Sequence, residues 1–115
     1  MHALIIEDEF LTAQLIRDYL AELAFTSFAF AMDEEEAVAV ARECCPDLIT
    51  SDVLLSRGCG IDAVQRICEL KPIAVLYITG SAMMVRERCP SAVLIQKPFG
   101  RAALREAVRL TRQTA

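Results

Sequence analysis

Short, continuous apolar runs alternate along this chain with longer amphipathic stretches, and this alternation restricts the possible folds more than any other feature. Residues 3–6 read Ala-Leu-Ile-Ile and stop at three acidic residues, which is typical of a strand buried on both faces. Residues 10–24 instead repeat large apolar side chains at helical spacing, at Ile16, Tyr19, Leu20 and Leu23. A buried strand followed by an amphipathic helix is the repeating unit of a parallel sheet.

This unit occurs five times. We expect strands over residues 3–6, 26–31, 47–52, 73–79 and 92–95, and helices over residues 10–24, 34–45, 61–70, 81–89 and 101–112. Asp33 and Glu36 form a capping-box pattern at the start of the second helix, and Pro46 ends that helix. Right-handed crossovers place helices on both faces of a parallel sheet, so the pattern predicts a doubly wound α/β fold.

The composition narrows the class of protein further. A chain of 115 residues is long enough for one domain, which we expect to span residues 1–115. Its 55% hydrophobic content excludes a disordered chain, and the net charge of −4 argues against a nucleic-acid surface. No apolar run approaches the ~20 residues that span a bilayer, and no signal peptide follows Met1, so we expect a cytoplasmic protein without a membrane partner.

The five cysteines do not predict a disulfide framework or a zinc site. Their number is odd, no CxxC pair occurs, and His2 is the single histidine. We therefore expect reduced thiols that act as small apolar residues, at Cys44, Cys45, Cys59, Cys68 and Cys89.

Chemically useful residues follow four of the five expected strands. Glu7 and Asp8 follow the first, Asp52 ends the third, Thr79 ends the fourth and Lys97 follows the fifth. The carboxyl ends of parallel strands form one rim, where ligands bind. Carboxylates gathered there repel each other unless a cation lies among them, and Mg²⁺ suits such oxygen ligands. The pattern predicts a Mg²⁺ site whose neighbouring Lys and Thr stabilise a phosphoryl group, with one carboxylate as the nucleophile.

Each of these residues also has a simpler explanation. The acidic residues 7–9 could favour the start of the first helix, and Asp52 could cap a loop. Lys97 could be a surface charge and Thr79 an ordinary strand residue. The phosphoryl-transfer interpretation rests on all four strand ends agreeing in order and in chemistry.

In these motifs the chain resembles the receiver domain of two-component response regulators, from Ala3 to about Thr111. The matching segments are Ile-Ile-Glu-Asp-Glu at 5–9, Pro-Asp-Leu-Ile-Thr-Ser-Asp at 46–52, Ile-Thr-Gly at 78–80 and Gln-Lys-Pro-Phe at 96–99. The resemblance implies a flavodoxin-like (βα)5 fold with strand order 2-1-3-4-5. The Ile-Thr-Gly segment is similar to a branch of receivers linked to general stress signalling.

The resemblance also assigns roles to single residues. Asp52 becomes the phospho-acceptor, and Glu7, Asp8, Asp52 and the backbone carbonyl of Leu54 become the ligands of Mg²⁺. Thr79 corresponds to the switch hydroxyl, and Lys97 to its ion-pair partner. A cis bond between Lys97 and Pro98 would aim the lysine into the site.

Several positions depart from the family pattern. Leu55-Ser56 replaces the frequent Met-Pro, and Cys59-Gly60 replaces Asp-Gly. Leu94 stands where a switching Tyr or Phe is usual, so we expect the switch to use the Gly80–Ser81 loop or repacking around Leu94. The short segment after Thr79 predicts a reduced or irregular fourth helix.

These observations predict a phosphorylation-dependent signalling switch rather than an enzyme with a substrate of its own. Its phosphoryl donor would be a sensor histidine kinase or a histidine phosphotransfer protein, docked near the first helix and the loop after the fifth strand. Its output would be contact with a downstream protein or a homodimer. The alternatives are a pseudo-receiver that binds partners without phosphorylation and a small aspartyl phosphatase, although such a phosphatase carries a second Asp where Leu54 stands.

Overall fold

Five parallel strands form one sheet in the order β2-β1-β3-β4-β5. The computed structural model describes residues 1–69 and 71–113. The strands are β1 (His2–Ile6), β2 (Ser27–Ala31), β3 (Leu48–Ser51), β4 (Ala74–Thr79) and β5 (Val93–Gln96). The predicted α/β class, the flavodoxin-like architecture and the strand order are therefore confirmed.

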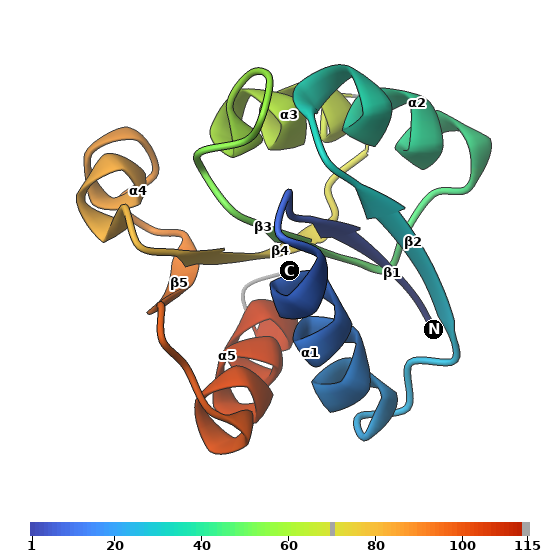
Figure 1. Ribbon diagram of the computed structural model, residues 1–115, viewed down its shortest axis with the longest axis vertical. Coiled ribbons are helices and arrows are strands. Elements are labelled where there is room, and N and C mark those ends of the chain that lie inside the picture. Colours follow the sequence, from blue (N-terminus) through green and yellow to red (C-terminus); the bar gives the residue numbers. More distant parts are fainter. Residues whose placement is uncertain (70, 114–115) are drawn as a thin grey trace.

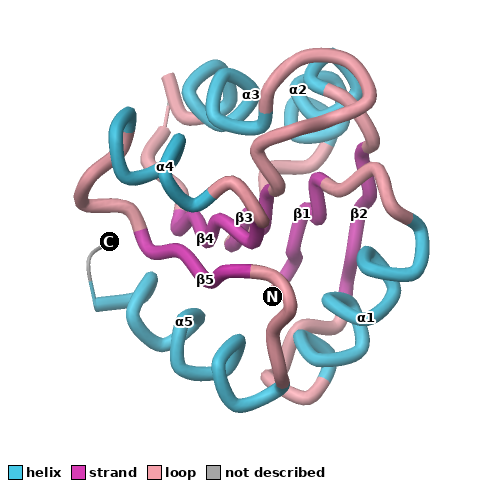
Figure 2. The backbone as a smooth tube through the Cα atoms, turned by 60° about the vertical axis from the view of Figure 1, so that its left-hand side comes forward, coloured by secondary structure: helices cyan, strands magenta, loops and turns pink. Residues whose placement is uncertain are grey.

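Helices cover both faces of this sheet (Figure 1). The helices are α1 (Phe10–Ala21), α2 (Glu34–Glu43), α3 (Gly60–Ile67), α4 (Ala82–Arg88) and α5 (Arg101–Gln113). α1 and α5 lie on one face and α2 and α3 on the other, while α4 lies beside β5 at the edge (Figures 1 and 2). Within residues 1–69 and 71–113, no helix combines the length and the apolar character needed to cross a bilayer.

The sheet separates two apolar cores. Side chains of β1 alternate between them: Ala3 and Ile5 pack in the core under α1 and α5, and Leu4 and Ile6 in the core under α2 and α3. These four side chains are at most 1% exposed. This burial on both faces is why the strand reads as a continuous apolar run.

Some element boundaries differ from the prediction. The first helix ends at Ala21 rather than at residue 24, because Ala24 adopts a left-handed φ of 72° that a helix does not allow. The third helix ends at Ile67, earlier than predicted. Its predicted end, Leu70, and the last two residues of the predicted domain, 114–115, lie outside the described residues. The fourth helix is short, as expected, with seven residues.

The predicted N-terminal cap of α2 is present in a modified form. The Asp33 carboxylate accepts from the Glu36 backbone N–H at 2.8 Å, as the capping box requires. The Glu36 carboxylate reaches one residue further back than in a standard box and accepts from the Met32 N–H at 2.6 Å. Both bonds fix the chain direction where β2 leads into α2.

The cysteines are free, as predicted, but they do not all act as apolar filling. Cys59, Cys68 and Cys89 pack beside the core under α2 and α3. Cys44 and Cys45 are exposed after the end of α2, so the prediction of an apolar packing role was wrong for these two. Cys44 is the C-cap of α2 and Cys45 follows it, so both lie in the connection between α2 and β3.

Candidate functional site

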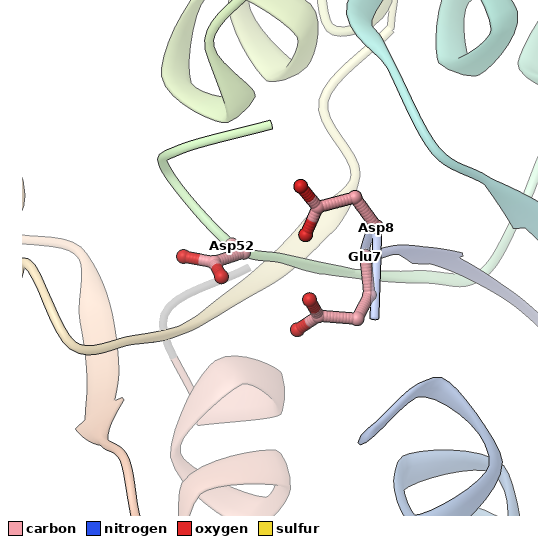
Figure 3. Close-up of side chains that lie close together, drawn as sticks. All are labelled: Glu7, Asp8 and Asp52. Atoms are coloured by element: carbon pink, nitrogen blue, oxygen red, sulfur yellow. The ribbon is translucent and has the colours of Figure 1, made fainter. Parts of the chain in front are cut away.

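The ends of β1 and β3 bring three carboxylates together. Ile6 pairs with Ser51 in the sheet, so the residues that follow these two positions, Glu7 and Asp52, leave the strands side by side. One carboxylate oxygen from each of Glu7, Asp8 and Asp52 lies within 4.8 Å of the other two. Figure 3 shows the Glu7 and Asp8 side chains at the end of β1, with their carboxylates directed toward Asp52, which follows β3.

Lys97 contacts this group from the edge strand β5, two strands away from β3. The residue follows β5, and its Nζ lies 2.8 Å from Glu7 Oε1 and 2.8 Å from Asp52 Oδ2. Glu9 Oε1 is more distant, at 3.6 Å. The Lys97–Pro98 peptide bond is cis, as the resemblance implied. The lysine therefore links the strand ends that the sequence predicted to meet.

Burial and hydrogen bonding shift the pKa values of Glu7 and Lys97 in this cluster. Glu7 is 3% exposed and Asp52 is 9% exposed. Burial raises the pKa of Glu7, although its hydrogen bond with Lys97 opposes the shift. Burial alone would lower the pKa of Lys97, but its hydrogen bonds to Asp52 and Glu7 outweigh that effect and raise it. Lys97 is therefore a fixed positive charge beside the carboxylates.

The ligand atoms fit Mg²⁺ in their chemistry. They are carboxylate oxygens, which a hard divalent cation prefers, and they come from Glu7, Asp8 and Asp52. When these three and Glu9 are ionised, the single charge of Lys97 leaves a net negative cluster. An additional cation would relieve the repulsion that remains.

The backbone around Asp52 is held by contacts that the sequence did not predict. Asp52 Oδ1 accepts from the Val53 N–H at 2.6 Å, and the Asp52 carbonyl accepts from the Ser51 hydroxyl at 2.8 Å. Gly60 lies against that carbonyl so tightly that an added Cβ would be 1.7 Å from the oxygen. In the sequence, this contact is indicated only by a glycine at position 60. The folded chain is needed to show that this glycine packs against the Asp52 carbonyl.

Thr79 lies on the same rim, but its hydroxyl bonds to the loop after β4 and not to the side chains of Glu7, Asp52 or Lys97. β4 runs between β3 and β5, and the Thr79 carbonyl accepts from the Lys97 N–H at 3.0 Å. The Thr79 side chain is buried, and its hydroxyl accepts from the Ser81 N–H at 3.0 Å. The structure therefore joins Glu7, Asp52 and Lys97 directly, with Asp8 beside them and Thr79 one strand away.

Two further features stay predictions: the Leu54 carbonyl as a metal ligand, and repacking around Leu94 as part of the switch. The side chain of Leu54 is 59% exposed, and its backbone pairs with Cys59 in an isolated antiparallel bridge. Leu94 pairs with Tyr77 across β5 and β4, so an aromatic ring lies on the neighbouring strand instead of at position 94. Tyr77 is buried in the core under α2 and α3, which raises its pKa.

An apolar surface borders the acidic cluster. Phe10 and Leu11, at the start of α1, are 73% and 80% exposed. Beside them a cavity of about 340 Å³ is lined by Thr12, Leu15, Lys97, Pro98 and Phe99. Lys97 thus contacts both the acidic cluster and this cavity.

Comparisons with known proteins agree with this geometry. The chain is 27% identical over 110 residues to the chemotaxis protein CheY of Thermotoga maritima, with 91% of this chain and 92% of that protein covered. It is 36% identical over 100 residues to the phyllosphere-induced regulator PhyR of Methylorubrum extorquens, covering 84% of this chain and 38% of that protein. A crystal structure of a variant of the anti-anti-sigma factor PhyR from Bartonella quintana aligns with a TM-score of 0.82 at 30% identity, covering 99% of this chain and 50% of that one.

The alignments differ in how much of each relative they cover. The chain spans nearly the whole of CheY but half or less of the two PhyR proteins. The family model of the response regulator receiver domain matches residues 3–109. Together with the five-stranded parallel sheet, this match establishes that the chain belongs to the response regulator receiver domain family.

Proposed function

We propose that this protein is a phosphorylation-dependent signalling switch that accepts a phosphoryl group on Asp52. The observation that carries the proposal is the convergence of Glu7, Asp8, Asp52 and Lys97 at one rim of the sheet. Asp52 is the carboxylate of this group that follows β3, at the centre of the strand order. Its two oxygens are oriented by the Val53 N–H and by Lys97.

The reaction needs an oriented carboxylate and a positive charge beside it. A carboxylate oxygen of Asp52 attacks the phosphorus of the donor's phosphohistidine. The new O–P bond forms as the N–P bond breaks, and the imidazole nitrogen keeps the electron pair and takes a proton from water. Lys97, 2.8 Å from Asp52 Oδ2, neutralises charge on the transferred group. Water later hydrolyses the acyl phosphate, which releases inorganic phosphate and restores the carboxylate.

Mg²⁺ is the proposed cofactor. Glu7, Asp8 and Asp52 would hold it through carboxylate oxygens, and Leu54 through its backbone carbonyl. When bound, Mg²⁺ supplies positive charge to the phosphoryl oxygens. The protein's own part is to keep these oxygens close together before the donor arrives.

Phosphorylation would alter the rim beyond Asp52. It adds about −1.5 to −2 of charge and three acceptor oxygens. We propose that the Thr79 hydroxyl then donates to a phosphoryl oxygen and gives up its bond with the Ser81 N–H. The Gly80–Ser81 loop and α4 would move as a result.

The proposed donor is a sensor histidine kinase or a histidine phosphotransfer protein, acting in the cytoplasm. The exposed apolar side chains of Phe10 and Leu11 and the cavity beside Pro98 suit a helical donor that brings its phosphohistidine to the rim. We propose that the output is contact with a downstream protein, or a homodimer, rather than with nucleic acid. The relationship to PhyR, described as an anti-anti-sigma factor, suggests a regulator of transcription as one such protein partner.

The direct test is labelling by acetyl phosphate, a small donor that needs no partner. We expect the wild-type chain to gain one phosphoryl group by mass spectrometry and Asp52→Asn to gain none. Asp18→Asn is the matched control, because Asp18 is exposed on α1 and pairs with Arg17 away from the rim. Stoichiometric labelling of Asp52→Asn would show that another residue is the acceptor.

The metal is tested separately. We expect EDTA to suppress labelling, and Mg²⁺ added in excess to restore it. The double variant Glu7→Gln, Asp8→Asn should bind Mg²⁺ more weakly by calorimetry, because two of the three clustered carboxylates lose their charge. Unchanged Mg²⁺ affinity in this variant would refute the metal assignment.

A further inference from the structure

We propose that Glu34 is a positioning residue for the loop that follows Asp52, an inference that rests on the function proposed above. This acceptor loop, residues 53–59, carries Leu54, whose carbonyl is a proposed ligand of Mg²⁺. Glu34 is the first residue of α2, distant in sequence, and its side chain is 21% exposed. Its contacts with the acceptor loop connect a helix outside the acidic cluster to the cluster itself.

Glu34 contacts the acceptor loop in three ways. Its backbone N–H donates to the Arg57 carbonyl at 3.0 Å, and its Oε1 accepts from the Cys59 N–H at 3.2 Å. Gly58, between these two residues, has a φ of 85°, and a Cβ there would lie 2.6 Å from Glu34 Cβ. The loop passes so close to Glu34 that a glycine is needed, for its left-handed backbone and for its lack of a side chain.

The contact at Cys59 is transmitted to the acidic cluster. Cys59 pairs with Leu54 in the antiparallel bridge, and the next residue, Gly60, donates from its N–H to the Val53 carbonyl at 2.8 Å. Gly60 also packs on the Asp52 carbonyl. Holding the Cys59 amide therefore holds the segment that includes the phospho-acceptor and the proposed carbonyl ligand.

The Glu34 side chain is itself oriented by a second partner. Its other oxygen, Oε2, accepts from Arg66 Nη1 of α3 at 2.9 Å. Arg66 also pairs with the neighbouring Glu35 at 2.8 Å, but the Glu35 side chain is 80% exposed. The two glutamates share one arginine, and Glu34 adds the side-chain bond to the acceptor loop. Glu35 is therefore a matched control for charge and for the ion pair.

We expect Glu34→Ala to weaken Mg²⁺ binding about tenfold, the lower end of the ~10–100-fold losses seen when a group that orients a metal ligand is removed. Glu34→Asp keeps the negative charge at the start of α2, but it is one methylene too short to keep the 3.2 Å bond, so it should lose affinity similarly. Glu34→Gln keeps an acceptor oxygen at full length for the Cys59 N–H but places its NH2 group against Arg66, so it should lose less affinity than Glu34→Asp. Glu35→Ala should bind Mg²⁺ as the wild type does.

The experiment measures Mg²⁺ affinity by calorimetry and, without Mg²⁺, the hydrogen exchange of the Cys59 amide by NMR. We expect faster exchange in Glu34→Ala and Glu34→Asp than in Glu34→Gln, and wild-type exchange in Glu35→Ala. If Glu34→Ala does not fold, the Asp and Gln variants alone decide the question. Wild-type affinity and exchange in Glu34→Asp, or equal losses in Glu35→Ala, would overturn the inference. A wild-type chain that binds no Mg²⁺ would instead overturn the proposed function, whatever the exchange at Cys59 shows.

Discussion

The close packing of Gly60 against Asp52 can be tested by the substitution Gly60→Ala, because the atoms that an added Cβ would contact are known. The Cβ of an alanine would lie 1.7 Å from the Asp52 carbonyl oxygen and 2.5 Å from Ser51 Oγ. An ordinary contact begins near 3.4 Å, so the backbone of Asp52 must retreat by roughly 1.7 Å or α3 must shift away. Overpacking of this kind costs about 3 kcal/mol, against which alanine recovers ~1 kcal/mol by reducing the conformational entropy of the unfolded chain.

We therefore expect Gly60→Ala to lower the free energy of unfolding by about 2 kcal/mol relative to the wild type. At about 4 °C per kcal/mol, its Tm should be lower by roughly 8 °C. Displacement of Asp52 should slow labelling by acetyl phosphate about 100-fold, because misplacement of a reacting group by ~1 Å can cost that much. Urea unfolding and single-turnover labelling measure the two effects.

Gly100→Ala is the control for this prediction, because an added Cβ there meets nothing within 4 Å. It should leave labelling unchanged and alter the unfolding free energy by no more than about 1 kcal/mol. If Gly60→Ala and Gly100→Ala are equally stable and label equally fast, the close contact at Asp52 has no influence on the site, and the reasoning fails.

Other predictions concern charge and thiol reactivity. Lys97→Met removes the cation that binds Glu7 and Asp52, so the variant should bind Mg²⁺ more tightly by calorimetry yet accept phosphate more slowly; weaker Mg²⁺ binding would contradict this account. Thiol titration of the native chain should modify the exposed Cys44 and Cys45 first. Burial raises the pKa of Cys68, so its rate of reaction should keep rising to a higher pH than is usual for a thiol. If Cys68 reacts as fast as Cys44 and Cys45, its thiol is accessible to the reagent and the prediction is wrong.

The sequence predicted those parts of the site that follow from sheet topology. Once β1, β3 and β5 are placed in a parallel sheet, the residues after them must share a rim, so Glu7, Asp52 and Lys97 could be expected to meet. The positions of these strand ends are set by the sheet topology and do not depend on the details of side-chain packing.

Contacts that depend on packing between distant elements could not be predicted. The bond between Glu34 and Cys59 exists because α2 and α3 are neighbours on one face of the sheet, and no local pattern at either residue indicates it. Similarly, the early end of α1 follows from the left-handed backbone at Ala24, a residue that ordinarily continues a helix. The bond from the Ser81 N–H to the Thr79 hydroxyl is local, but no residue pattern around Gly80 indicates it.

The contacts of the acceptor loop give the rim two unequal halves. On the half nearest α2, residues 57–60 are hydrogen-bonded to Glu34 and Val53, and neither Gly58 nor Gly60 has room for a Cβ. On the half nearest α4, a side chain at Gly80 would find nothing within 4 Å, and the helix that follows has seven residues. A bulky charged group attached to Asp52 therefore meets resistance in one direction and room in the other, so any rearrangement that it drives should propagate toward β5 and leave the surface of α2 as it was.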